Sequence, residues 1–184
     1  MRWQRLFSDL EAQAEELATR DFEGEVAERT RIEIGKLRLV DRLRAATGHP
    51  VQVSCLGAGL VCGDLDQVGS GWLLLTESPG REALIPLDAV LSLVGLGALS
   101  ATPGSEGRVG SRLDLRHALR RIVRDRAPVQ VLLVDGTGFD GTLDRVGADF
   151  VEVAEHPRGE PRRSTAVQRV RTLPLAALAL VRTG

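Results

Sequence analysis

The chain has 184 residues, of which 43% are hydrophobic and 27% charged, and its 24 basic residues against 25 acidic ones leave a formal net charge of -1. This composition is that of a globular protein and excludes a strongly basic, a disordered or a collagen-like chain. Two cysteines are too few for a disulfide framework. Because we find neither a secretory signal nor an apolar run long enough to span a membrane, we expect a cytoplasmic protein that does not contact membranes.

The first predicted element is an amphipathic helix within residues 1–28. Its apolar residues recur at alternating intervals of four and three, which places Trp3, Phe7, Leu10, Ala14 and Leu17 on one face. This face either packs on the rest of the chain or binds a protein partner or a second copy. Two heptads are short for an independent coiled coil, which favours the first alternative. The candidate partner-binding residues are Trp3, Phe7, Leu10 and Leu17. A second helix is expected over residues 25–46.

An internal duplication organises the rest of the chain. Residues 50–77 align without gaps with residues 128–155, and ten of the 28 positions are identical. A second pair of segments, residues 85–89 and 173–177, matches after an insertion of about ten residues in the second copy. Two matches in the same order indicate two copies of one folding unit.

Each copy carries the signals of five short strands. In the second copy, apolar residues alternate from Val129 onward, and Asp135-Gly136 is typical of a two-residue hairpin turn. Gly141, like Gly63 in the first copy, suits a sharply bent strand in which a side chain would crowd the interior. A Pro-Leu-x-Ala segment then separates the fourth strand from the fifth, because proline has no N–H to donate to a sheet.

A helix is expected before each set of strands. The spacing of Leu115, Leu119 and Ile122 predicts one over residues 112–126, with Ser111 and Asp114 forming its cap. The predicted fold is therefore α+β and mainly β: two tandem small barrels, each a helix plus five strands, with an extra N-terminal helix. The expected divisions are the N-terminal helix at 1–28, the first barrel with its helix at 29–96, a flexible linker at 97–110 and the second barrel with its helix at 111–184.

The segment F-x-G-x-L-x-x-V-G-x-D-F-V-x-V, Phe139 to Val153, resembles the first motif of Sm-like (Lsm) domains. The resemblance covers residues 30–95 and 112–184, and SH3-like barrels share its strand pattern. It implies small barrels that form oligomers and associate with RNA. The positions that hold uracil in Sm proteins carry Gly147 and Val151 here, so uridine recognition is not implied. The whole chain also resembles uncharacterised proteins of GC-rich bacteria, some of them labelled Fis family transcriptional regulators.

Arginines gather in two places. Residues 106–127 hold seven basic and three acidic residues, and four of the arginines recur every fourth position along the predicted helix. The longer loop of the second copy carries five more. Together they form a candidate nucleic-acid-binding set: Arg112, Arg116, Arg120, Arg124, Arg158, Arg162, Arg163, Arg169 and Arg171. The simpler interpretation is a solvated helix face with intramolecular ion pairs; the alternative is contact with RNA or DNA phosphates.

No arrangement of residues indicates catalysis. His49, His117 and His156 lack metal-ligand spacing, and the glycines from Gly57 to Gly63 align with a hairpin rather than a phosphate-binding loop. We therefore expect no catalytic residues, no metal and no cofactor. The sequence favours a non-enzymatic regulatory protein associated with RNA or another nucleic acid through its arginines. The alternative is a protein-protein interaction adaptor or self-assembling scaffold with no nucleic-acid role.

Overall fold

The structure is a computed structural model that describes residues 28–101, 113–157 and 167–184. The chain divides into two compact units, Met1–Arg38 and Leu39–Gly184. In the first unit the described residues form a helix over residues 28–36. The next helix, α2 (Leu39–Ala45), belongs to the second unit, so the single helix expected over residues 25–46 is interrupted. The predicted partner-binding residues Trp3, Phe7, Leu10 and Leu17 lie outside the described residues.

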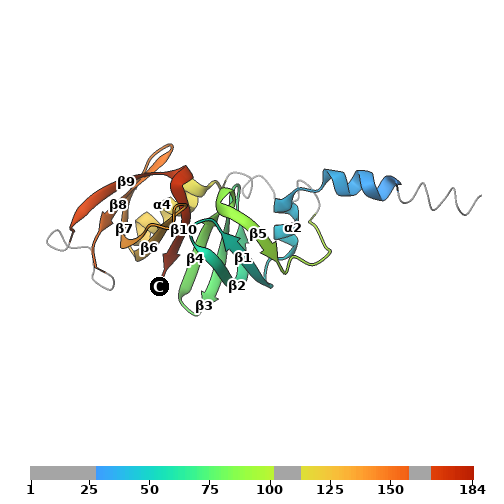
Figure 1. The fold of residues 1–184 in the computed structure, drawn as a ribbon, viewed down its shortest axis with the longest axis horizontal. Coiled ribbons are helices and arrows are strands. Elements are labelled where there is room, and N and C mark those ends of the chain that lie inside the picture. The colour runs from blue at the N-terminus through green and yellow to red at the C-terminus, as the bar shows by residue number, and fades with distance from the viewer. Residues whose placement is uncertain (1–27, 102–112, 158–166) are drawn as a thin grey trace, which may run out of the picture. The chain divides into compact units, whose positions relative to one another are not determined.

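The second unit contains one antiparallel sheet of ten strands (Figure 1). The first repeat supplies β1 (Pro50–Cys55), β2 (Gly59–Val68), β3 (Trp72–Ser78), β4 (Arg81–Pro86), the short 3-10 helix η1 (Leu87–Ala89) and β5 (Val90–Val94). The second repeat begins with α4 (Leu115–Asp125) and supplies β6 (Pro128–Leu133), β7 (Gly138–Val146), β8 (Phe150–Glu155), β9 (Arg169–Pro174), η2 (Leu175–Ala177) and β10 (Leu178–Thr183). Pro86 and Pro174 end the fourth strand of each repeat, as the sequence predicts.

The prediction of two separate five-stranded barrels is wrong. The strand order is β5-β1-β2-β3-β4-β10-β6-β7-β8-β9, so the two repeats form one continuous open sheet. They join where β4 pairs with β10, in the register Leu84↔Val181 and Glu82↔Thr183. A strand at the edge of a sheet exposes unpaired N–H and C=O groups. Pairing the edge of one repeat with the edge of the other satisfies these groups without closing either repeat on itself.

The two repeats share strand order and register. Val51 lies opposite Gly63 in the first repeat, and Val129 lies opposite Gly141 in the second. Each second strand also carries a β-bulge at the same place, between Leu65 and Gln67 in β2 and between Leu143 and Arg145 in β7. The topology of the stretch after Pro50 is therefore that of the stretch after Pro128.

Each repeat encloses its own hydrophobic core, and the two joining strands contribute to both. In β4, Ile85 packs in the first core and Leu84 in the second; in β10, Leu180 packs in the first and Val181 in the second. The helices cover the cores with fully buried leucines, Leu43 of α2 on the first and Leu119 of α4 on the second. Because the joining strands are buried on both faces, separating the repeats would expose both cores.

Two pairs of equivalent glycines have steric reasons. A Cβ at Gly63 or Gly141 would lie 2.6 Å from the Thr76 carbonyl oxygen or 2.3 Å from that of Ala154, so the obstacle is the neighbouring strand rather than a barrel interior. Gly69 and Gly147 lie under the rings of Trp72 and Phe150, where a Cβ would come within 2.1 and 2.3 Å of ring carbons.

The turn expected at Asp135-Gly136 is longer than predicted. β6 ends at Leu133 and β7 begins at Gly138, which leaves four residues rather than two. The Asp135 carboxylate accepts a hydrogen bond from the Thr137 amide at 2.8 Å, and Gly136 adopts a φ of 88°. The local bond of Asp135 stabilises this wider turn, and it lowers the pKa of that carboxyl.

Candidate functional site

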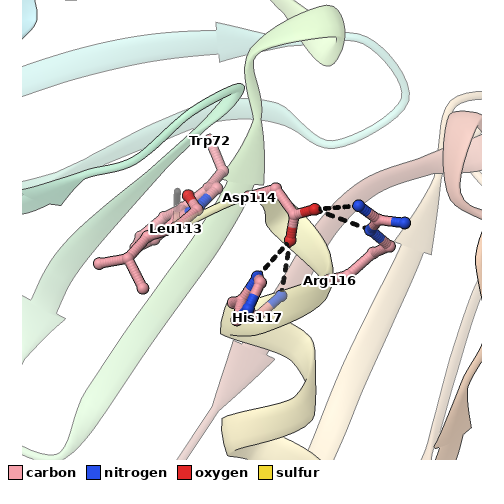
Figure 2. A network of polar contacts seen from close by, with 5 residues as sticks. All are labelled: Trp72, Leu113, Asp114, Arg116 and His117. Carbon is pink, nitrogen blue, oxygen red and sulfur yellow. Dashed lines mark hydrogen bonds and ion pairs between the residues drawn. The ribbon is translucent and has the colours of Figure 1, made fainter. Parts of the chain in front are cut away.

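The start of α4 is organised by one carboxylate, Asp114 (Figure 2). Its Oδ1 accepts a hydrogen bond from the backbone N–H of His117 at 3.0 Å and lies 2.7 Å from the His117 ring Nδ1. Its Oδ2 accepts from Nε of Arg116 at 2.7 Å. Asp114 is thus the N-cap, and the helix begins at Leu115 rather than at residue 112 after a cap by Ser111.

These contacts stabilise the charged form of Asp114. Partial burial raises the pKa of this carboxyl, but the hydrogen bonds from Arg116 and His117 together outweigh burial, and the pKa falls from 3.8 to about 2. The Arg116 guanidinium is therefore neutralised by its neighbour in the chain. Among the described arginines of the predicted ridge, Arg116 is the one that binds the N-cap residue of α4.

A tryptophan of the first repeat holds the residue before the cap. The indole Nε1 of Trp72 donates a hydrogen bond to the backbone oxygen of Leu113 at 2.8 Å, and the Ser70 amide donates to the same oxygen at 3.0 Å. The Trp72 side chain is 5% exposed and packs in the core of the second repeat. α4 is thus fixed to the first repeat at its N-terminal end (Figure 2).

The remaining described arginines of α4 face solvent. Arg120, Arg121 and Arg124 are exposed, and none makes a hydrogen bond or ion pair with another described residue. Arg112 lies outside the described residues. The ridge expected from the sequence therefore consists, where it is described, of one paired and two unpaired arginines, with Arg121 beside them.

The described arginines of the second group are held in ion pairs. Arg169 and Arg171 lie in strand β9 rather than in a loop, and both donate to Glu155, from Nε at 2.7 and 2.6 Å. These bonds, first that of Arg169 and then that of Arg171, lower the pKa of Glu155 from 4.5 to about 2 against the opposing effect of burial. Arg171 also lies over the Phe139 ring, 4.7 Å from its centre. Arg158, Arg162 and Arg163 lie outside the described residues.

The two outer strands of the sheet are open along one side. Among the described strands, β5 pairs only with β1, and β9 pairs only with β8. Both carry exposed apolar side chains: Leu91 and Val94 of β5 are 65% and 62% exposed, and Val170 of β9 is 55% exposed. Natural edge strands usually carry charges or proline to discourage pairing. β9 carries such charges, Arg169 and Arg171, and ends at Pro174, whereas β5 carries neither a charged residue nor a proline.

A cavity of about 310 Å³, termed here the inter-repeat pocket, lies beside α4. Its apolar lining includes the buried side chains of Trp72, Leu84 and Val181, from β3, β4 and β10. Its polar lining includes Asp66, Glu82, Arg121 and Asp125. The volume is at the lower end of the range of about 300–1,000 Å³ for ligand pockets.

The described residues also include histidine, cysteine and acidic side chains outside these surfaces. No group of three or more His, Cys, Asp or Glu side chains is placed to hold a metal ion there. Cys55 and Cys62 are free thiols, and burial raises the pKa of Cys55 to about 11, which disfavours a reactive thiolate. His156 is buried, and its Nε2 lies 2.9 Å from the Thr142 hydroxyl.

Comparison with known proteins adds no assignment, since no family model, curated protein or solved structure matches the chain. Over the same described ranges, no helix has both the length and the apolar character needed to cross a membrane.

Two features of these surfaces were missed from the sequence although signals existed. Glu77 and Glu155 are identical in the alignment of the repeats, and both hold arginines: Glu155 binds Arg169 and Arg171, and Glu77 binds Arg182 at 2.6 Å. Asp66 is likewise repeated, as Asp144. Asp66 is the extra residue of the β-bulge in β2 and lines the inter-repeat pocket.

Proposed function

We propose that this protein is a non-enzymatic, self-assembling scaffold whose copies join edge to edge. The observation that carries the proposal is the equivalence of its sheet edges. Inside the chain, the fourth strand of one repeat (β4) pairs with the fifth strand of the other (β10). The strands left open are the fifth of the first repeat (β5) and the fourth of the second (β9). They are the same two kinds of edge.

The internal junction defines the expected geometry between copies. Residues of the second repeat follow those of the first by 88 positions in this region. The internal pair Leu84↔Val181 therefore corresponds to Thr172 of one copy opposite Leu93 of the next. Main-chain hydrogen bonds would supply affinity, and the exposed Val94 and Val170 would lose their contact with water.

Such a contact uses different surfaces on its two sides. Head-to-tail contacts of this kind produce rings when the rotation closes and filaments when it does not. The proposal includes four expectations from the sequence: no enzymatic activity, no cofactor, no membrane contact and a cytoplasmic location. A role of the 1–28 helix in self-association remains a prediction.

Sedimentation velocity on the full chain over a wide concentration range tests the scaffold. We expect oligomers whose fraction grows with concentration. Val94→Lys and Val170→Lys each place a charge on an open edge and should weaken the affinity between copies at least tenfold. Leu99→Lys is the matched control, because Leu99 is 75% exposed but lies outside the strands. A chain that stays monomeric throughout, or edge variants that assemble as the control does, would refute the proposal.

A second candidate function, binding of RNA or DNA phosphates, is favoured by the unpaired arginines of α4. Arg120 and Arg124 lie one helical turn apart and are exposed, so both are available to neutralise phosphates. The described residues offer fewer such arginines than the sequence predicts, since Arg169 and Arg171 are held by Glu155.

Filter binding of RNA at increasing salt separates this candidate from the scaffold. The double variant Arg120→Gln/Arg124→Gln should weaken binding and reduce the slope of log affinity against log salt by about 1 to 2. Arg145→Gln is the control, because Arg145 is exposed but bound to Glu152 at 2.7 Å. No binding at low salt, or equal binding by the double variant and the control, would rule out this function.

A further inference from the structure

The inter-repeat pocket exists because the repeats are joined. Its apolar floor comes from both sides of the junction, with Trp72 and Leu84 from the first repeat and Val181 from the second. α4 forms one wall and is tied to the first repeat by the hydrogen bond from Trp72 to Leu113. The floor is therefore apolar surface held in a fixed position before any ligand arrives.

The rim of the pocket is negatively charged. Asp66, Glu82 and Asp125 are exposed lining residues, and Arg121 is the one guanidinium among the described lining side chains. Three carboxylates against one guanidinium leave a formal charge of -2. None of these four side chains has a hydrogen bond or ion pair with another described residue, so their charges are not compensated there. The His117 ring, which also lines the pocket, is bound to Asp114.

The position of Asp66 depends on a backbone irregularity. In the pairing of β2 with β3, Leu65 lies opposite Leu75 and Gln67 opposite Leu74, so Asp66 is the extra residue of a bulge. Bulges redirect one side chain and occur often beside binding sites. Here the bulge places a carboxylate at a cavity whose floor is apolar, which is the pairing of surfaces that an amphipathic cation requires.

We propose that the inter-repeat pocket binds a small organic cation: an apolar body carrying one ammonium or guanidinium group. The apolar body displaces water from Trp72, Leu84 and Val181, and the cation lies among the carboxylates of Asp66, Glu82 and Asp125. Anionic ligands are disfavoured by the same three carboxylates. The pocket is thus distinct in charge from the arginine face of α4, and its ligand is distinct from a nucleic acid.

Binding at this place also links the ligand to the junction. Because residues of both repeats line the pocket, the ligand binds the joined state and not a chain whose repeats have separated. A ligand that binds only the folded state raises the midpoint of thermal unfolding as its concentration increases. The inference does not rest on the proposed scaffold, since the pocket lies within one chain.

Three probes of nearly equal shape test the charge preference: 2-phenylethylamine, 2-phenylethanol and phenylacetate. Titration of the full chain is followed by NMR at the two indole N–H signals. Trp72 lines the pocket, and Trp3 serves as the second, internal signal. We expect the amine to shift the Trp72 signal and to bind about tenfold more tightly than the alcohol, with phenylacetate weaker still. Equal affinity for all three probes, or no shift at millimolar amine, would overturn the proposal.

Conservative variants locate the cation. Asp66→Asn and Glu82→Gln should each weaken the amine about two- to fivefold, the effect of removing one partly exposed ion pair, and leave the alcohol unchanged. Asp64→Asn is the matched control, because Asp64 lies in the same strand, is exposed and is not part of the lining. Retained affinity in both pocket variants, or an equal loss in Asp64→Asn, contradicts the assignment. Circular dichroism of each variant reports whether its fold is intact.

Discussion

Trp72 is the side chain on which the attachment of α4 to the first repeat most depends. It is 5% exposed, packs in the core of the second repeat, and donates its indole N–H to the Leu113 oxygen at 2.8 Å. Trp72→Ala removes the whole ring and leaves a cavity beside Leu84, which is expected to cost about 3–5 kcal/mol of unfolding free energy. The first turn of α4 should then exchange its amide hydrogens faster.

Trp72→Phe is the matched change, because Phe150 occupies the equivalent place in the second repeat. Phenylalanine retains a ring over Gly69 but loses the hydrogen bond to Leu113. The Leu113 oxygen still accepts from Ser70 at 3.0 Å, so the lost bond should cost only about 1 kcal/mol.

Urea unfolding followed by far-ultraviolet circular dichroism measures both variants, since this signal does not depend on the remaining Trp3. We expect the alanine variant to lose at least twice as much stability as the phenylalanine variant. If the two lose the same amount, the hydrogen bond rather than packing dominates and the reasoning fails. A loss below about 1 kcal/mol in the alanine variant would mean that Trp72 does not support the junction.

Three further predictions concern single sites. Gly141→Ala should destabilise by about 1–3 kcal/mol, because its Cβ would meet the Ala154 carbonyl oxygen at 2.3 Å. Chemical denaturation measures the change, and a variant as stable as wild type would show that the contact with β8 is unimportant. Glu155→Gln should loosen the ends of β8 and β9, because it releases Arg169 and Arg171. The Arg169 amide should then exchange its hydrogen faster than in wild type. Unchanged exchange would show that the ion pairs do not stabilise this pair of strands. The pKa values of Asp114 and Glu155 are both lowered to about 2, so their contribution to stability is present above about pH 4.5 and is lost as pH falls toward 2. The unfolding free energy of Glu155→Gln should therefore fall less over this range than that of wild type. Identical profiles of unfolding free energy against pH would refute the prediction.

Much of the local structure follows from short-range rules that a sequence displays. The proline in each Pro-Leu-x-Ala segment ends a strand in both repeats because it cannot donate a hydrogen bond, and the two copies share register from Val51 and Val129 onward. The face of α4 that carries Leu119 is buried as its spacing predicts. The arginine ridge was also visible, but which arginines are paired was not, since Glu155 of β8 meets Arg171 only once β9 pairs with β8.

Closure was decided only in three dimensions. A five-strand pattern is compatible with a barrel that closes on itself or with a sheet that continues into a neighbour, because the alternation of apolar residues along each strand is the same in both. What distinguishes them is the partner of the fourth strand, and here β4 pairs with β10, almost a hundred positions later in the chain. Every residue except proline offers the same backbone N–H and C=O groups, so side-chain patterns specify the faces of a strand but not which edge it meets. The inter-repeat pocket follows from that same pairing, since its lining is brought together from β2, β3, β4, α4 and β10.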